Sequence, residues 1–138
     1  MKTLLISTFV LLFSIHLSAQ ETAEVYVLRK TGYSGSAIGF NLIMDGELLC
    51  KARNKRYSVH QVPAGDHSFQ ARIFGKKKMK KKSMEPLDLS FEAGETYYLQ
   101  LNLKSRAFDS QVDVQEITKS SANRIMPDLK LQENCKTE

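Results

Sequence analysis

Hydrophobic and polar residues alternate one by one along most of the chain. This period of two is typical of a β-strand with one face on a core and the other in solvent. The residues expected to face the core are Ile38, Phe40, Leu42 and Met44; Phe69, Ala71 and Ile73; Leu87, Leu89 and Phe91; Tyr97, Leu99, Leu101 and Leu103; and Val112 and Val114. Residues 25–28 are apolar on both sides, which predicts a central strand covered on both faces.

Turn-forming residues separate these runs. Asp45-Gly46 lies between two apolar runs and predicts a two-residue hairpin turn, while residues 63–66 and 93–95 carry the proline and glycines of further turns. Strands recur about every ten residues, with no helical segment between them long enough for a β-α-β crossover. The sequence therefore predicts an all-β fold, an antiparallel β-sandwich of seven or eight strands.

The end of the chain departs from this period. Residues 117–125 are compatible with a short helix that ends before Pro127, and we expect the polar stretch 132–138 to fray. The expected organisation is a sandwich domain at residues 20–119, followed by a C-terminal helix and tail at residues 120–138.

The first 19 residues have the pattern of a secretory signal peptide. Lys2 supplies the positive charge, residues 4–17 are uncharged and mostly apolar, and Ser18-Ala19 precedes Gln20. As a helix, this apolar stretch would rise about 21 Å, which is short of the ~30 Å hydrocarbon core. The junction also lacks the cysteine that lipid attachment requires. We therefore expect export to the periplasm, the outer surface or the medium, with no transmembrane segment after signal removal.

Composition is that of one ordinary folded domain, but its charge is local. The chain has 138 residues, of which 42% are hydrophobic and 25% charged, with a formal net charge of +5. Without residues 1–19 the net charge is +4, and without six clustered lysines it would be −2. The six are Lys76, Lys77, Lys78, Lys80, Lys81 and Lys82. The expected picture is a mildly acidic sandwich with one basic loop.

The lysine cluster is a candidate anion-binding site. Six like charges repel one another and favour an extended loop between two strands, able to contact an anionic envelope polymer or lipid. The alternative is a solvated loop without a ligand. Binding of nucleic acid is disfavoured because only Met79 interrupts the cations, whereas single strands stack on interleaved aromatic residues.

Two cysteines and two histidines complete the candidate chemistry. Export would allow a disulfide between Cys50 and Cys135, but two free thiols remain an equal alternative. His60 and His67 flank the turn at residues 63–66, so a metal-binding or catalytic site around them is a weaker hypothesis. Their spacing matches no metal signature, and we predict neither a metal nor a cofactor. No nucleophile elbow or phosphate loop occurs, so we predict no catalytic residue and no enzymatic activity.

Several short segments resemble a known family. They are residues 24–29, Met44-Asp45-Gly46, residues 62–67 and residues 93–99. Over about residues 23–117, the chain resembles small secreted bacterial domains of unknown function that are similar to PEGA-type and prealbumin-like (transthyretin-like, Ig-like) β-sandwiches. The resemblance implies a non-enzymatic envelope or surface module and supplies no catalytic residue. The lysine-rich insert departs from the pattern of that family.

Together these features favour a non-catalytic binding module associated with the envelope, which contacts an anionic component through the lysine-rich loop. A structural accessory or protein-interaction module that binds through a sheet edge is the alternative, with an envelope protein as its partner.

Overall fold

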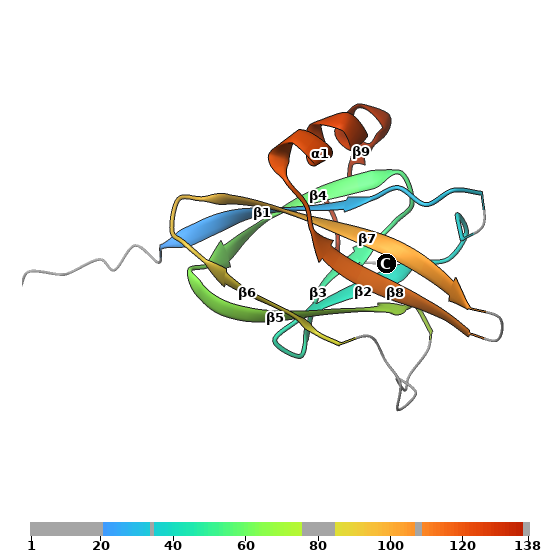
Figure 1. Ribbon diagram of the computed structural model, residues 1–138, viewed down its shortest axis with the longest axis horizontal. Helices are drawn as coiled ribbons and strands as arrows, with labels where there is room; N and C mark the ends of the chain where they lie inside the picture. Colours follow the sequence, from blue (N-terminus) through green and yellow to red (C-terminus); the bar gives the residue numbers. More distant parts are fainter. Residues whose placement is uncertain (1–20, 34, 76–84, 107–108, 137–138) are drawn as a thin grey trace, which may run out of the picture.

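The computed structural model describes residues 21–33, 35–75, 85–106 and 109–136. In these residues, nine strands form two sheets that face each other, as Figure 1 shows. The strands are β1 (Thr22–Arg29), β2 (Phe40–Met44), β3 (Glu47–Ala52), β4 (Arg56–Pro63), β5 (Gly65–Ile73), β6 (Leu87–Phe91), β7 (Thr96–Arg106), β8 (Asp109–Glu116) and β9 (Lys130–Leu131). The helix α1 (Lys119–Ile125) and the 3-10 turn η1 (Met126–Asp128) lie between β8 and β9. The predicted all-β sandwich with a short C-terminal helix is confirmed, but the described residues hold nine strands instead of seven or eight, because the two-residue β9 after the helix adds one.

The sheets have the strand orders β8-β7-β1-β4-β9 and β3-β2-β5-β6. Most neighbours are antiparallel, but β1 pairs in parallel with β7, and β4 pairs in parallel with β9. The expectation of a purely antiparallel sandwich is therefore wrong at these two pairs. Between β1 and β7 the chain builds the whole four-stranded sheet and then enters β7 from the same end as β1 (Figure 1), and no helix lies among the described residues of this segment.

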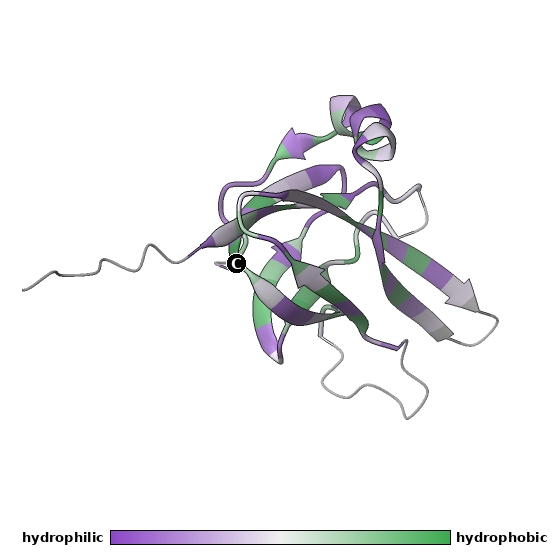
Figure 2. Cartoon of the chain, turned by 60° about the vertical axis from the view of Figure 1, so that its left-hand side comes forward, coloured by the Kyte–Doolittle hydropathy of each residue, from purple (hydrophilic) through white to green (hydrophobic). Residues whose placement is uncertain are grey.

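The core lies between the sheets and contains the residues that alternation predicted. Figure 2 shows hydrophobic and hydrophilic bands alternating along the strands. Buried side chains of both sheets form one cluster, which includes Val25, Val27, Phe40, Leu42, Phe69, Phe91, Leu99, Leu101 and Val112. Ile38 is an exception, because it lies before β2 and is 36% exposed.

A second cluster covers the outer face of the five-stranded sheet. Leu28 and Tyr98 are buried there against Ala122 of α1 and against Leu129. Thr118 caps the helix, since its hydroxyl accepts a hydrogen bond from the Ser121 amide. The strand β1 is thus covered on both faces, by the core on one side and by α1 on the other, as its two-sided hydrophobicity predicted.

The turn between β2 and β3 also follows the prediction. Met44 pairs with Glu47, and the two residues between them have positive φ angles of 51° at Asp45 and 85° at Gly46. Two consecutive positive φ angles define the primed hairpin turn that Asp-Gly favours.

A buried cation lies at the end of β1. Arg29 is fully buried, and its guanidinium carbon lies 3.5 Å from the centre of the Phe40 ring. It donates hydrogen bonds to the backbone carbonyls of Ala52, Gly35 and Ile38. Burial lowers the pKa of Arg29 to about 10, so the side chain is still charged at neutral pH. This side chain therefore fixes the segment between β1 and β2 to the end of β3.

Candidate functional site

A C-terminal strap, residues 129–136, closes one side of the sandwich. Its strand β9 pairs with Arg56 and Tyr57 of β4, and the Gln132 amide donates to the Tyr57 carbonyl. Farther along, the Lys51 amide of β3 donates to the Cys135 carbonyl over 2.7 Å. The expectation that this stretch frays is wrong up to residue 136, because its backbone is hydrogen-bonded to one strand of each sheet.

The strap is also attached covalently. Cys50 of β3 and Cys135 form a disulfide, with 4.5 Å between their Cα atoms and a sequence separation of 85. Cys50 is fully buried, whereas Cys135 is 8% exposed. Of the two alternatives that the sequence left open, the structure has the disulfide.

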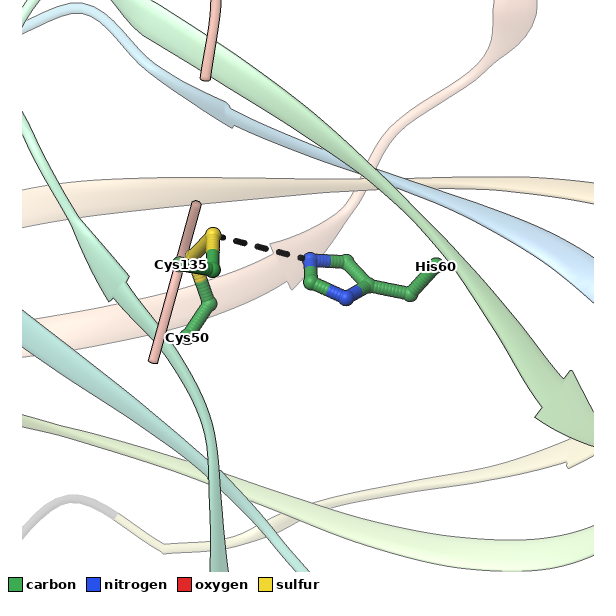
Figure 3. Close-up of side chains that lie close together, drawn as sticks. All are labelled: Cys50, His60 and Cys135. Atoms are coloured by element: carbon green, nitrogen blue, oxygen red, sulfur yellow. Dashed lines mark hydrogen bonds between the residues drawn. A yellow bond between two sulfur atoms is a disulfide. The ribbon is translucent and has the colours of Figure 1, made fainter. Parts of the chain in front are cut away.

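Ser58 and His60 lie beside this disulfide. They are two residues apart on β4, so alternation places both side chains on one face. The Ser58 hydroxyl lies 2.8 Å from Nε2 of His60 and 3.5 Å from Sγ of Cys50. In Figure 3, the imidazole of His60 points at the sulfur of Cys135, 4.0 Å from Nε2. Sequence analysis missed this contact, because nothing in the sequence places Cys135 near β4.

An open pocket of about 350 Å3 gives access to these groups. Its lining includes Ser58 and His60 of β4 and Gln132, Cys135 and Lys136 of the strap. Burial lowers the pKa of His60 below its ordinary value, and the positive charge of Lys136 lowers it further. The imidazole is therefore neutral at pH 7 and offers a lone pair.

The structure separates the two histidines that the sequence considered together. Nδ1 of His67 lies 2.6 Å from a carboxylate oxygen of Asp45, and Nε2 lies 2.8 Å from the Pro63 carbonyl oxygen. Burial opposes a charge on His67, but hydrogen bonds to Asp45 and Pro63 raise its pKa above the ordinary value. Its hydrogen bonds are those of a structural histidine that holds the β2–β3 turn. A shared site of His60 and His67 does not form.

His60 instead belongs to a group of potential metal ligands. Its imidazole nitrogen and the sulfur atoms of Cys50 and Cys135 all lie within 4.8 Å of one another. Within the described ranges, this is the one group of three or more such side chains at that spacing. A hydrolytic Ser–His arrangement is less well supported, because in the same ranges Nδ1 of His60 has no hydrogen-bond partner to orient it, and Ser58 is buried.

A second feature lies on the outer face of the four-stranded sheet. Lys51, Asn41 and Arg72 are direct cross-strand neighbours on β3, β2 and β5, and alternation turns them away from the core. Phe74 follows on the same side, 57% exposed, with its ring centre 5.7 Å from Nζ of Lys51. We call Lys51, Arg72 and Phe74 the basic end of this sheet.

The predicted anion-binding lysines, Lys76, Lys77, Lys78, Lys80, Lys81 and Lys82, lie outside the described residues. In the sequence they follow Gly75, the residue after Phe74. Glu92 and Glu95 flank the β6–β7 turn, at the opposite end of the sandwich from the end of β5 (Figure 1).

Comparison with known protein families identifies the family of this chain. A family described as proteins of unknown function, DUF2846, matches residues 19–114. The chain belongs to the DUF2846 family. The matched segment includes β1 to β7 and most of β8, and therefore Cys50, Ser58, His60 and the basic end, whereas Cys135 lies beyond it. No curated protein matches the DUF2846 chain. In the described residues, no helix is long and apolar enough to cross a bilayer.

Proposed function

We propose that this DUF2846 chain is an exported, non-catalytic β-sandwich, akin to PEGA-type and prealbumin-like domains, that binds phosphate-bearing lipids of the bacterial envelope. The observation that carries the proposal is the basic end of the four-stranded sheet. Two cations and an exposed aromatic ring share one surface there, and the chain continues from this surface directly into the lysine cluster of residues 76–82.

The chemistry of this surface suits a lipid headgroup layer. A cation near an anionic bilayer contributes about 1 kcal/mol, so Lys51 and Arg72 contribute about 2 kcal/mol and the six lysines several more, before ordering costs. Phe74 adds an exposed ring of the kind that enters the apolar boundary below the headgroups. The acidic turn around Glu92 and Glu95 lies at the far end of the sandwich, where an anionic surface would not repel it.

Export is supported by two independent features. Residues 1–19 have the composition of a signal peptide, and the Cys50–Cys135 bond is of a kind that persists in oxidising compartments and is rare in the cytosol.

Binding through a sheet edge is less well supported. The strap occupies part of the β3 edge, where the Lys51 amide already donates to Cys135. The edge strands β6 and β8 carry Asp88 and Asp113, and charged residues on an edge disfavour the addition of another strand.

The test is co-sedimentation of the mature protein with vesicles. Vesicles of phosphatidylglycerol and phosphatidylcholine, vesicles of phosphatidylcholine alone, and vesicles that contain lipopolysaccharide distinguish charge from lipid type. We expect binding to both anionic kinds, with the affinity falling as salt rises. Replacing the six lysines by serine should remove most of the binding. Lys51→Ser with Arg72→Ser should weaken it about thirtyfold, from the two lost cations.

The matched control is Lys119→Ser with Arg124→Ser, which removes the same charge from α1 on the other sheet. This control should bind like the native protein. Equal loss in both double variants would mean that net charge alone drives association. Salt-insensitive retention of all variants would overturn the proposal.

A further inference from the structure

We propose that, once the disulfide is reduced, Cys50, His60 and Cys135 form a three-ligand site for a borderline-soft divalent ion, with Zn²⁺ the best fit. The ligands come from β3, β4 and the strap, and they meet at the pocket described above (Figure 3). This site is separate from the basic end, and the inference does not depend on lipid binding.

The donor set and its spacing fit a tetrahedral ion. Zn²⁺ binds thiolate sulfur at about 2.3 Å and imidazole nitrogen at about 2.0–2.1 Å, which places tetrahedral ligand atoms about 3.5–3.8 Å apart. Nε2 of His60 already lies 4.0 Å from Sγ of Cys135, and all three ligand atoms lie within 4.8 Å of one another. The main change that metal binding requires is separation of the two sulfur atoms, which breaking their bond permits.

Ser58 is placed to support the metal-bound state. Its hydroxyl lies between Nε2 of His60 and Sγ of Cys50, at 2.8 Å and 3.5 Å. When a metal ion takes the lone pair of Nε2, the hydroxyl can turn and donate to the Cys50 thiolate. Hydrogen bonds of this kind orient ligands and raise metal affinity.

The fourth coordination position would open into the pocket. Three protein ligands leave one position of a tetrahedral ion for water or an added ligand. The pocket of about 350 Å3 has room for such a ligand, and Lys136 in its lining favours an anionic one. The arrangement therefore resembles an exchangeable metal site more than a closed structural one.

Redox state decides which form exists. A dithiol reductant breaks the sulfur–sulfur bond, transfers two electrons and two protons to Cys50 and Cys135, and is itself oxidised to a disulfide. Binding of Zn²⁺ then releases the two thiol protons. The disulfide and the metal complex use the same sulfur atoms, so they exclude each other. Reduction thus turns metal binding on, and oxidation turns it off.

The test is a metal titration of the mature protein in both redox states, with a phosphine as reductant. We expect one Co²⁺ per reduced chain, with thiolate-to-cobalt charge-transfer absorption and the intense visible bands of tetrahedral Co²⁺. Zn²⁺ should displace the cobalt. The oxidised protein should show neither signal, and reoxidation should release the bound ion.

Variants identify the ligands. His60→Gln should weaken Zn²⁺ binding at least tenfold and reduce the visible cobalt bands. The control His67→Gln, which changes the other histidine of the described residues, should bind like the native protein. Cys135→Ser should lose the two-thiolate signal. Binding by the oxidised protein, or equal weakening by His60→Gln and His67→Gln, would overturn the proposal.

If reduction destabilises the fold, thermal unfolding followed by circular dichroism still tests the site. An ion that binds the folded state stabilises it, so Zn²⁺ should raise the melting temperature of the reduced native protein but not that of reduced His60→Gln. A reduced native protein with a melting temperature indifferent to Zn²⁺ would count against the site.

Discussion

Loss of the Cys50–Cys135 disulfide should lower the free energy of unfolding by a large fraction of the total. Cys135→Ala removes the bond and one sulfur atom at the margin of the core, and it leaves the fully buried Cys50 in place. The bond joins residues separated by 85 positions, and closing a loop of that length lowers the entropy of the unfolded chain. The chain-entropy model then gives about 4–5 kcal/mol of stabilisation. Domains of this size are stable by about 5–15 kcal/mol, so much of the margin depends on this bond.

The assay is equilibrium unfolding in urea, followed by circular dichroism. The free energy of unfolding of Cys135→Ala should be lower than that of the native protein by about 4–5 kcal/mol. A chelator in the buffer excludes stabilisation by metal ions. Reduction of the native protein should cause nearly the same loss, because both changes remove the same constraint.

Two comparisons can refute this reasoning. The double variant Cys50→Ala with Cys135→Ala should be less stable than Cys135→Ala only by the packing lost with the buried Cys50 sulfur, because the bond can be lost only once. A loss below about 1 kcal/mol in Cys135→Ala would show that the hydrogen bonds of Gln132 and the burial of Leu129 hold the strap without the bond. In that case the constraint on the unfolded chain would not explain the stability.

Two further predictions concern charged groups. Arg29→Met should lower the free energy of unfolding by about 3–5 kcal/mol in urea titrations, because three backbone carbonyls lose their donor; a loss under 1 kcal/mol would contradict this. The pKa of His67 is raised, so its pairing with Asp45 stabilises the fold fully below pH 6.5 and less as pH rises through the folded-state value. The lowered pKa of Asp45 means that the pairing is also lost in acid, below about pH 4. Between pH 6.5 and 8.5, the free energy of unfolding should therefore fall by up to about 1 kcal/mol in the native protein and stay constant in His67→Gln. Equal pH profiles for the two proteins would refute the pairing.

Local alternation predicted the faces of the strands but not their partners. The inward rows and the Asp45-Gly46 turn followed from the sequence, because each depends on neighbours within a few residues. The parallel pairing of β1 with β7 did not, because Val25 and Tyr97 are partners across 72 positions of sequence. The hydrophobic period of a strand carries no information on which distant strand pairs with it in the sheet.

The buried cation shows a signal that sequence analysis could have used. Arg29 has the same strand parity as Val25 and Val27, so alternation along β1 already turns it toward the core. Its acceptors are backbone carbonyls, which any sequence offers, so its hydrogen-bond partners are visible only in the folded structure.

The candidate site also has a part that the sequence could indicate and a part that it could not. Ser58 and His60 are two residues apart on β4, so alternation alone places them on one face of that strand. Cys135 was not, since a polar tail with a single cysteine gives no indication of where it docks. The strap reaches the pocket because Leu129 is buried under α1 and β9 pairs with β4, and both are tertiary contacts.

The basic end and the Cys50–His60–Cys135 site can be separated by experiment because they depend on different parts of the chain. Lys51, Arg72 and Phe74 lie within the segment that matches the DUF2846 family, whereas the metal-binding group needs Cys135, which lies beyond it. Cys135→Ala removes a ligand from the pocket but no charge from the sheet face. Lys51 is nevertheless next to Cys50, and its amide donates to Cys135. If vesicle binding changes on reduction of the native protein as well as in Cys135→Ala, the strap must position Lys51, and the redox state of the pocket would then set the affinity of the basic end. If it changes in neither, the two surfaces act independently.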